Sequence, residues 1–202
     1  VRQRRPAGNA DAVRLAAQFV GDESFVVGFG DTIVTSPGPK GVVARLIEDH
    51  QQSGAAATIA VWEVPHAEAS RYGVIRPAVK DPVDAFPIDE IVEKPAPGQA
   101  PSHLAVAARY VFTPRIFDAI AATEPGVKGE LWLTDAIRLL LEWGELVRCV
   151  RLQEGERRYD IGTPLTYYRA FVDFALADPE HGVAFAEYLR TCLPGEQRET
   201  GT

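Results

Sequence analysis

Apolar residues recur at regular spacings along the first third of the chain. Residues 9–20 and 40–52 carry apolar positions three and four apart, so each stretch predicts an amphipathic helix. Residues 24–29 and 56–64 are nearly continuous apolar runs, which are typical of strands buried on both faces. The resulting order of helix, strand, helix, strand is the pattern of a parallel α/β sheet.

The middle of the chain has a different pattern. Three strand-like runs follow one another without a long helix between them, at residues 72–77, 88–92 and 104–112. This arrangement predicts a mixed or antiparallel insertion in the sheet. Two helices are then predicted, at residues 114–122 and 133–142, the second of them capped by Thr134 or Asp135.

The last quarter combines strands and helices. Residues 146–152 and 157–161 predict two closely spaced strands that form a ribbon, and two helices follow within about 164–190. No stretch rich in Gly, Ser or Pro marks a domain boundary, so residues 1–202 are predicted to form a single domain. The predicted fold class is α/β, with a mixed, mostly parallel sheet flanked by helices.

The composition of the chain bears on which kinds of molecule it binds. The formal net charge of −7 argues against broad binding to nucleic acid or to an anionic membrane, although a local cationic pocket for a small phosphate ligand is compatible with it. No apolar window is long enough to span a membrane, and no secretory signal is visible. The two cysteines, Cys149 and Cys192, form no metal-binding pattern. A cytoplasmic protein with free thiols is expected.

Two aspartates follow predicted strands. Asp31 comes directly after the buried run at residues 24–29, and Asp160 stands near the end of the strand at residues 157–161. Ligands of open α/β sheets collect at the carboxyl ends of strands, and carboxylates there can hold Mg²⁺, which prefers oxygen ligands. The alternative is that both aspartates only form turns or helix caps.

Glu93 and Lys94 are adjacent at the end of a predicted strand, which Pro95 terminates. Lysine is a compact charge suited to phosphate, and glutamate accepts hydrogen bonds from sugar hydroxyls. The alternative is a solvated charge pair beside a loop. Gly73 opens another strand, where a glycine either lets a ligand approach the backbone or permits a bend.

Several motifs stand in a fixed order along the chain. They are YGVI at 72–75, IVEKPAP at 91–97, APSHLAVAARYVFTPRIFD at 100–118, GELWLTDAI at 129–137 and YDIGTP at 159–164. Together they resemble the bacterial UTP–glucose-1-phosphate uridylyltransferases, within the sugar nucleotidyltransferase superfamily. The resemblance implies a Rossmann-like fold of the nucleotide-diphospho-sugar transferase type, and an enzyme that joins a nucleoside triphosphate to a sugar 1-phosphate with release of pyrophosphate.

The resemblance also implies roles for individual residues. Asp31 and Asp160 would bind the Mg²⁺ that bridges the two substrates. Lys94 would hold the sugar phosphate, Glu93 would accept hydrogen bonds from sugar hydroxyls, and Gly73 would offer its backbone to the sugar. Gln3 and Gly8 would belong to the segment that contacts the nucleotide base. These roles make Asp31, Lys94 and Asp160 the predicted catalytic residues.

The chain also departs from the family pattern. The Gly-rich loop that grips the triphosphate has no match, so the chain is expected to be incomplete at its N-terminal side. Ala108 stands where glycine is usual, and His103 where asparagine is usual. A thymidylyl- or adenylyltransferase and a non-catalytic, truncated sugar-phosphate-binding module are the alternative functions. Family members often pair or form tetramers, so a homo-oligomer is compatible with the sequence, which leaves the oligomeric state open.

Overall fold

The computed structural model describes residues 1–126 and 129–192. They belong to two compact units, Val1–Arg158 and Tyr159–Thr202, and each is treated separately. This division reflects compactness alone, so the single domain over residues 1–202 stays a prediction.

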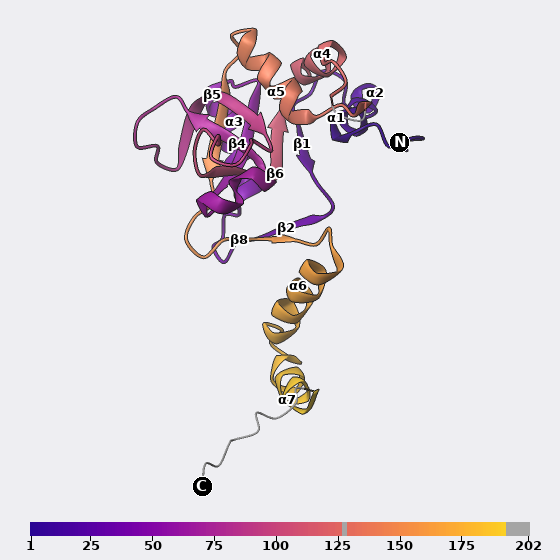
Figure 1. Cartoon of the computed structure of the whole chain (residues 1–202), viewed down its shortest axis with the longest axis vertical. Coiled ribbons are helices and arrows are strands. Elements are labelled where there is room, and N and C mark those ends of the chain that lie inside the picture. The colour runs from indigo at the N-terminus through magenta and orange to yellow at the C-terminus, as the bar shows by residue number, and fades with distance from the viewer. Residues whose placement is uncertain (127–128, 193–202) are drawn as a thin grey trace. The chain divides into compact units, whose positions relative to one another are not determined.

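A six-stranded sheet forms the centre of the first unit (Figure 1). Its spatial order is β1 (Phe25–Gly28), β6 (Leu104–Phe112), β3 (Ala57–Glu63), β7 (Val147–Arg151), β5 (Ala85–Glu93) and β4 (Gly73–Pro77). β1, β3, β4 and β7 run in one direction, and β5 and β6 run in the other. The predicted mixed sheet is therefore confirmed.

The pairing of neighbouring strands corrects one part of the prediction. Within the described residues, β3 and β7 are the parallel neighbours, and the other neighbouring pairs are antiparallel. A sheet of mostly parallel neighbours was expected because a helix separates β1 from β3 along the chain. These two strands do share a direction, but β6 lies between them and pairs antiparallel with both. The helix thus connects two strands that are not neighbours.

Helices cover both faces of the sheet, as predicted. α1 (Asn9–Arg14), α4 (Arg115–Ala122) and α5 (Leu133–Glu142) pack into the main core cluster, and α3 (Val42–Ser53) packs into a second cluster. Alternate residues of β3 divide between the clusters, with Ile59 in the first and Ala60 in the second. Full burial of a side chain such as Ile59 contributes about 1.5–3 kcal/mol to folding.

The predicted ribbon of residues 146–152 and 157–161 is wrong. β7 has β3 on one side and β5 on the other, so no edge of β7 is open to the next strand. β8 (Arg157–Asp160) pairs instead with β2 (Thr32–Thr35), a short strand that the apolar pattern did not predict. A six-residue 3₁₀ helix, η1 (His66–Arg71), was also not predicted.

Two helix starts differ from the prediction. The helix expected at residues 9–20 is broken into α1 and α2 (Ala17–Val20). α5 begins after Trp132, whose side chain forms no capping hydrogen bond, and the Leu133 amide donates instead to the Asn9 side chain at 2.7 Å. The predicted capping by Thr134 or Asp135 is therefore wrong, and the Thr134 hydroxyl binds a different partner.

The second unit contains two helices, α6 (Pro164–Leu176) and α7 (Gly182–Cys192). α6 begins with a capping box, in which the Thr163 hydroxyl accepts a hydrogen bond from the Thr166 amide, and Pro164 occupies its first turn. Across the described residues of both units, none of the helices has the length and apolar character that a membrane crossing requires.

Candidate functional site

Gly73, Glu93 and Thr134 meet where β4 and β5 come together. Gly73 stands opposite Glu93 in the register of the two strands. The Glu93 Oε2 atom accepts a hydrogen bond of 2.7 Å from the Thr134 hydroxyl. A Cβ atom on Gly73 would lie 3.2 Å from Glu93 Oε2 and 3.5 Å from Thr134 Oγ1. Glycine therefore keeps room beside this carboxylate.

The environment of Glu93 disfavours its charged form. Burial raises the pKa of the Glu93 carboxyl, while the hydrogen bond from Thr134 and the charge of Lys94 act in the opposite direction. The side chain keeps 22% of its surface exposed. Glu93 is thus a partly buried acceptor, held by one hydroxyl.

Lys94 lies in the left-handed region of backbone conformation, with φ at 43°. Consecutive side chains of a regular strand point to opposite faces, and this φ interrupts that alternation. The Lys94 ammonium lies 3.9 Å from Glu93 Oε1 and 4.9 Å from the centre of the Trp132 ring. Half of the Lys94 side chain is exposed. The structure therefore brings Glu93 and Lys94 together on one side of the strand, with the ammonium accessible.

Asp31 lies on the turn between β1 and β2, and its side chain is exposed. Arg109 supports this turn from β6, because its guanidinium donates to the Phe29 carbonyl at 3.3 Å and to the Thr32 carbonyl at 2.5 Å. Burial and the nearby charge of Arg158 lower the pKa of Arg109, and the charge of Asp31 opposes this shift. Arg109 was missed in the sequence, although a lone arginine within the apolar run at residues 104–112 was a usable signal.

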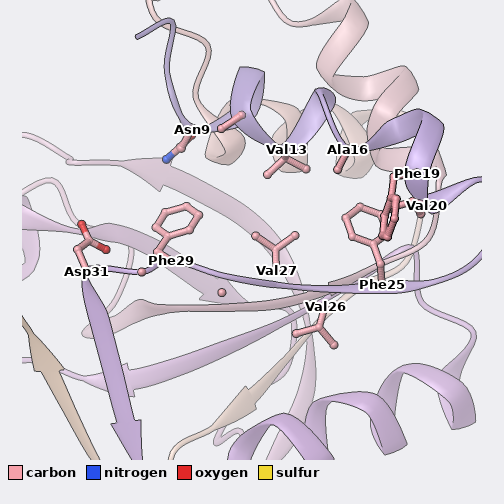
Figure 2. Close-up of a pocket in the computed structure, with 13 residues that line it drawn as sticks. Asn9, Val13, Ala16, Phe19, Val20, Phe25, Val26, Val27, Phe29 and Asp31 are labelled. Atoms are coloured by element: carbon pink, nitrogen blue, oxygen red, sulfur yellow. The ribbon is translucent and has the colours of Figure 1, made fainter. Parts of the chain in front are cut away.

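A cavity of about 720 Å³ lies between α1, α2 and β1, with Asp31 and Asn9 at one end (Figure 2). Its walls are mostly apolar, and Phe25, Val27 and Phe29 project into it from β1 and the turn that follows. The predicted carboxylate at this strand end therefore stands at the mouth of an apolar hollow.

Tyr110 connects the two carboxylates electrostatically. Burial raises the pKa of the Tyr110 hydroxyl, the charges of Glu93 and Asp31 raise it further, and those of Arg158 and Arg109 lower it. Glu93 and Asp31 thus both act on one buried phenol of β6. Glu93 and the turn of Asp31 therefore both lie near β6.

The middle of β6 is irregular. Ile59 pairs with Tyr110 and Val61 pairs with Val106, so β6 uses two residues more than β3 over this interval. Ala108 lies within this bulge with φ at 54°, a left-handed value that favours glycine. The glycine usual at this position in the resembled family is therefore explained by the backbone. Arg109, next along the chain, is the residue that donates to the carbonyls on either side of Asp31.

Gln3 and Gly8 also lie together. The Gln3 amide donates to the Gly8 carbonyl at 3.3 Å and to Asp11 at 2.7 Å. Gly8 has φ at 97°, and a Cβ atom there would lie 2.2 Å from the Leu131 carbonyl oxygen. Gly8 thus has a structural reason to be glycine, and the nucleotide role of both residues stays a prediction.

Asp160 belongs to the second unit. Its Oδ1 atom accepts a hydrogen bond of 2.9 Å from the Gly162 amide, in the turn before α6. Carboxylates such as Asp31 and Asp160 have the donor chemistry that Mg²⁺ prefers. Within the described residues, no three His, Cys, Asp or Glu side chains gather at one metal-binding point. The assignment of Asp31 and Asp160 to a Mg²⁺ ion stays a prediction.

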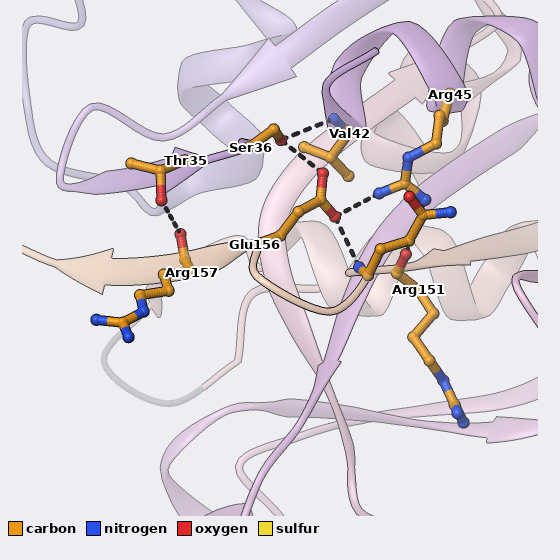
Figure 3. A network of polar contacts seen from close by, with 8 residues as sticks. Thr35, Ser36, Val42, Arg45, Arg151, Glu156 and Arg157 are labelled. Atoms are coloured by element: carbon orange, nitrogen blue, oxygen red, sulfur yellow. Dashed lines mark hydrogen bonds and ion pairs between the residues drawn. The ribbon is translucent and has the colours of Figure 1, made fainter. Parts of the chain in front are cut away.

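Glu156 fixes the connection between β7 and β8 (Figure 3). Its buried carboxylate pairs with Arg45 of α3, accepts a hydrogen bond of 2.5 Å from the Ser36 hydroxyl and accepts another of 2.7 Å from the Gln153 amide. The Thr35 hydroxyl donates to the Arg157 carbonyl at 3.5 Å. This network orients the start of β8, the strand that ends at Asp160.

A helix-covered mixed sheet with charged residues at strand ends defines an α/β protein of the type whose ligands bind at the carboxyl ends of strands. The chain belongs to the nucleotidyl transferase family, whose profile matches residues 1–176. It is 41% identical over 182 residues to UTP–glucose-1-phosphate uridylyltransferase 2 of Streptococcus pyogenes serotype M3, covering 89% of this chain and 60% of that protein. The chain thus spans about 60% of the length of such curated relatives.

Solved structures agree with this assignment. The UTP-bound UGPase of Acinetobacter baumannii superimposes with a TM-score of 0.83 at 32% identity, covering 94% of this chain and 64% of that one. A UDP-glucose pyrophosphorylase complexed with UDP-glucose gives a TM-score of 0.81 at 30% identity, covering 88% of this chain and 66% of that one. The predicted family and fold type are confirmed.

Proposed function

We propose that the whole protein transfers a uridylyl group from UTP to glucose 1-phosphate and releases pyrophosphate. The observation that carries the proposal is the arrangement of Glu93, Lys94 and Gly73, which combines an exposed cation, a partly buried acceptor and a backbone without a side chain beside that acceptor. The names of the relatives support the choice of UTP and glucose 1-phosphate.

In this reaction a phosphate oxygen of glucose 1-phosphate bonds to the α-phosphorus of UTP. The bond between the α-phosphorus and its bridging oxygen to the β-phosphate breaks, and pyrophosphate leaves with the electron pair. Catalysis of such a step depends on positioning and charge neutralisation. Lys94 holds the sugar phosphate, the Glu93 carboxylate accepts from sugar hydroxyls, and the Gly73 backbone contacts the sugar. Gln3 and Gly8 contact the base.

Mg²⁺ is part of the proposal. Asp31 and Asp160 are the residues that would hold it. When bound, this ion neutralises phosphate charge and aligns the two substrates. A cytoplasmic location is also proposed, in keeping with the free thiols of Cys149 and Cys192.

Calorimetry with glucose 1-phosphate tests the sugar half of the site. The 202-residue chain should bind this ligand, and Lys94→Met should weaken binding by about tenfold or more, since a charge-assisted phosphate contact contributes about 1.5–3 kcal/mol. Lys80→Met is the matched control, because Lys80 is also an exposed lysine but lies in the connection between β4 and β5. Equal affinities of the two variants would contradict the assignment of Lys94.

Pyrophosphate release tests the reaction. A chain extended to the full length of its relatives should release pyrophosphate from UTP in the presence of glucose 1-phosphate and Mg²⁺. The same assay with dTTP and ATP separates the thymidylyl and adenylyl alternatives. Binding of glucose 1-phosphate without release from any of the three nucleotides would instead indicate a non-catalytic module.

A further inference from the structure

Trp132 lies directly beneath the ammonium group of Lys94. The Lys94 Nζ atom is 4.9 Å from the centre of the indole ring, a distance at which a cation is attracted to the ring face. Trp132 is the N-cap residue of α5, and its surface is partly buried. The ring is also confined at its edge, because a Cβ atom on Gly126 would lie 3.4 Å from Trp132 Cδ1.

Lys94 needs such a partner if it is to stay in one place. A free lysine side chain loses rotamer entropy when it is fixed. The Lys94 ammonium has Glu93 at 3.9 Å, which is too long for a hydrogen bond of ordinary strength. Contact with the indole restricts the side chain further. It leaves the positive charge available to a phosphate, because an aromatic ring does not neutralise it.

The start of α5 thus contacts both Glu93 and Lys94. Thr134 holds the Glu93 carboxylate through a hydrogen bond of 2.7 Å, and Trp132, two residues earlier, contacts Lys94. We infer that Trp132 is a positioning residue whose indole holds the Lys94 ammonium where the phosphate of the sugar substrate binds. This inference rests on the proposed function of the Glu93 and Lys94 site.

A double-mutant cycle on glucose 1-phosphate binding tests the inference. In the otherwise unchanged 202-residue chain, Trp132→Leu should weaken binding by about two- to fivefold, as expected for an exposed cation–π contact, and Trp132→Phe should restore part of it. In a Lys94→Met background, Trp132→Leu should have no further effect. Trp132→Gln provides a second non-aromatic variant if the leucine variant does not fold.

A purely structural role, or direct stacking of the sugar on Trp132, gives the opposite result. Trp132→Leu would then weaken binding equally with and without Lys94, and this outcome would overturn the inference. The contact is also measured without ligand, after reductive methylation of lysines with ¹³C. The Lys94 methyl signal should show an upfield ring-current shift that Trp132→Leu removes. Its absence from the unchanged chain would likewise overturn the inference.

Failure of the proposed function looks different. If the unchanged chain does not bind glucose 1-phosphate, the proposed substrate is wrong, and the inferred role of Trp132 in binding it falls as well. If the chain binds and Lys94→Met weakens binding while Trp132→Leu does not, the proposed function stands and only the positioning role is wrong.

Discussion

Gly8 and Ala108 both have left-handed backbone conformations, but only one of them is a glycine. Position 8 requires glycine for two reasons. Its φ is 97°, and the Leu131 backbone leaves no room for a Cβ atom. Ala108 tolerates its φ of 54° inside a bulge of β6. Strained residues of this kind gather at functional sites, and Ala108 lies one residue from Arg109, which supports the turn of Asp31.

Gly8→Ala should strongly destabilise the protein. The substitution adds a left-handed alanine and a clash with Leu131, so we expect a loss of more than about 2 kcal/mol in the free energy of unfolding. Gly98→Ala is the matched control, because Gly98 has φ at 77° but no atom within 4 Å of a new Cβ. That control should lose only about 1 kcal/mol from strain. Urea denaturation measures both, and equal losses would contradict the close packing of Gly8 on Leu131.

Glu93→Gln should increase stability at neutral pH. The pKa of Glu93 is raised in the folded state by burial, so the unfolded chain releases this proton at lower pH than the folded chain. Stability is therefore lost as the pH rises from about 4.3 through the folded pKa, and it stays lower above that value. Glutamine removes this loss and can still accept the hydrogen bond from Thr134.

The measurement is urea denaturation of both forms between pH 4 and pH 8. The two curves should separate as the pH rises, with the glutamine variant the more stable. The same variant should bind glucose 1-phosphate more weakly if the carboxylate accepts from sugar hydroxyls. A lower stability of Glu93→Gln at pH 7 would contradict the burial argument.

At the scale of the elements, apolar periodicity predicted the long helices and strands, whose formation depends on local sequence. β6 and α5 match the apolar runs at residues 104–112 and 133–142. β2 was missed because four residues beside a turn carry little periodic signal. The partner of β8 was missed because both edges of β7 already pair with β3 and β5, which are distant in sequence. At the site, Glu93 and Lys94 were recognised as candidates because an acid and a base stand side by side at a strand end, directly before a proline. Trp132 and Thr134 act through contacts across some forty residues of sequence, which spacing alone does not reveal.

Glu156→Ala should lower the stability of the protein, because its carboxylate links α3 to the connection between β7 and β8. The Glu156 and Arg45 side chains are 4% and 12% exposed, so removal of the carboxylate leaves a buried guanidinium without its acid. We expect a loss of about 3 kcal/mol in unfolding free energy. Glu48→Ala is the control, since Glu48 pairs with Lys40 in a half-exposed position and should contribute less than about 1 kcal/mol. Similar losses in both variants would show that the Glu156 network is not buried in solution.

At the scale of the whole molecule, β1 is an apolar strand at a sheet edge. β6 pairs with one edge of β1, and no strand of the described residues pairs with its other edge. The cavity of about 720 Å³ lies on the face of β1 that carries Phe25 and Val27 (Figure 2). Val26 in this strand is 43% exposed. Edges of this kind promote association between chains unless charged or covered.

Val26→Lys should reduce self-association. A charge on an edge strand opposes pairing with a second copy, so light scattering of concentrated samples should decrease relative to the unchanged chain. Val183→Lys adds the same charge at a valine that is 79% exposed on α7, and it should have a smaller effect. If the two variants behave alike, net charge rather than the β1 edge controls association.

The central place of β6 has a consequence for synthesis of the protein. β1 and β3 are synthesised before β6 and β7, yet both form their described hydrogen bonds with these later strands. Until Phe112 has been added, neither strand can complete its pairing with β6. The apolar runs of β1 and β3 must therefore wait for β6 during translation, a period in which chaperones would be expected to bind them.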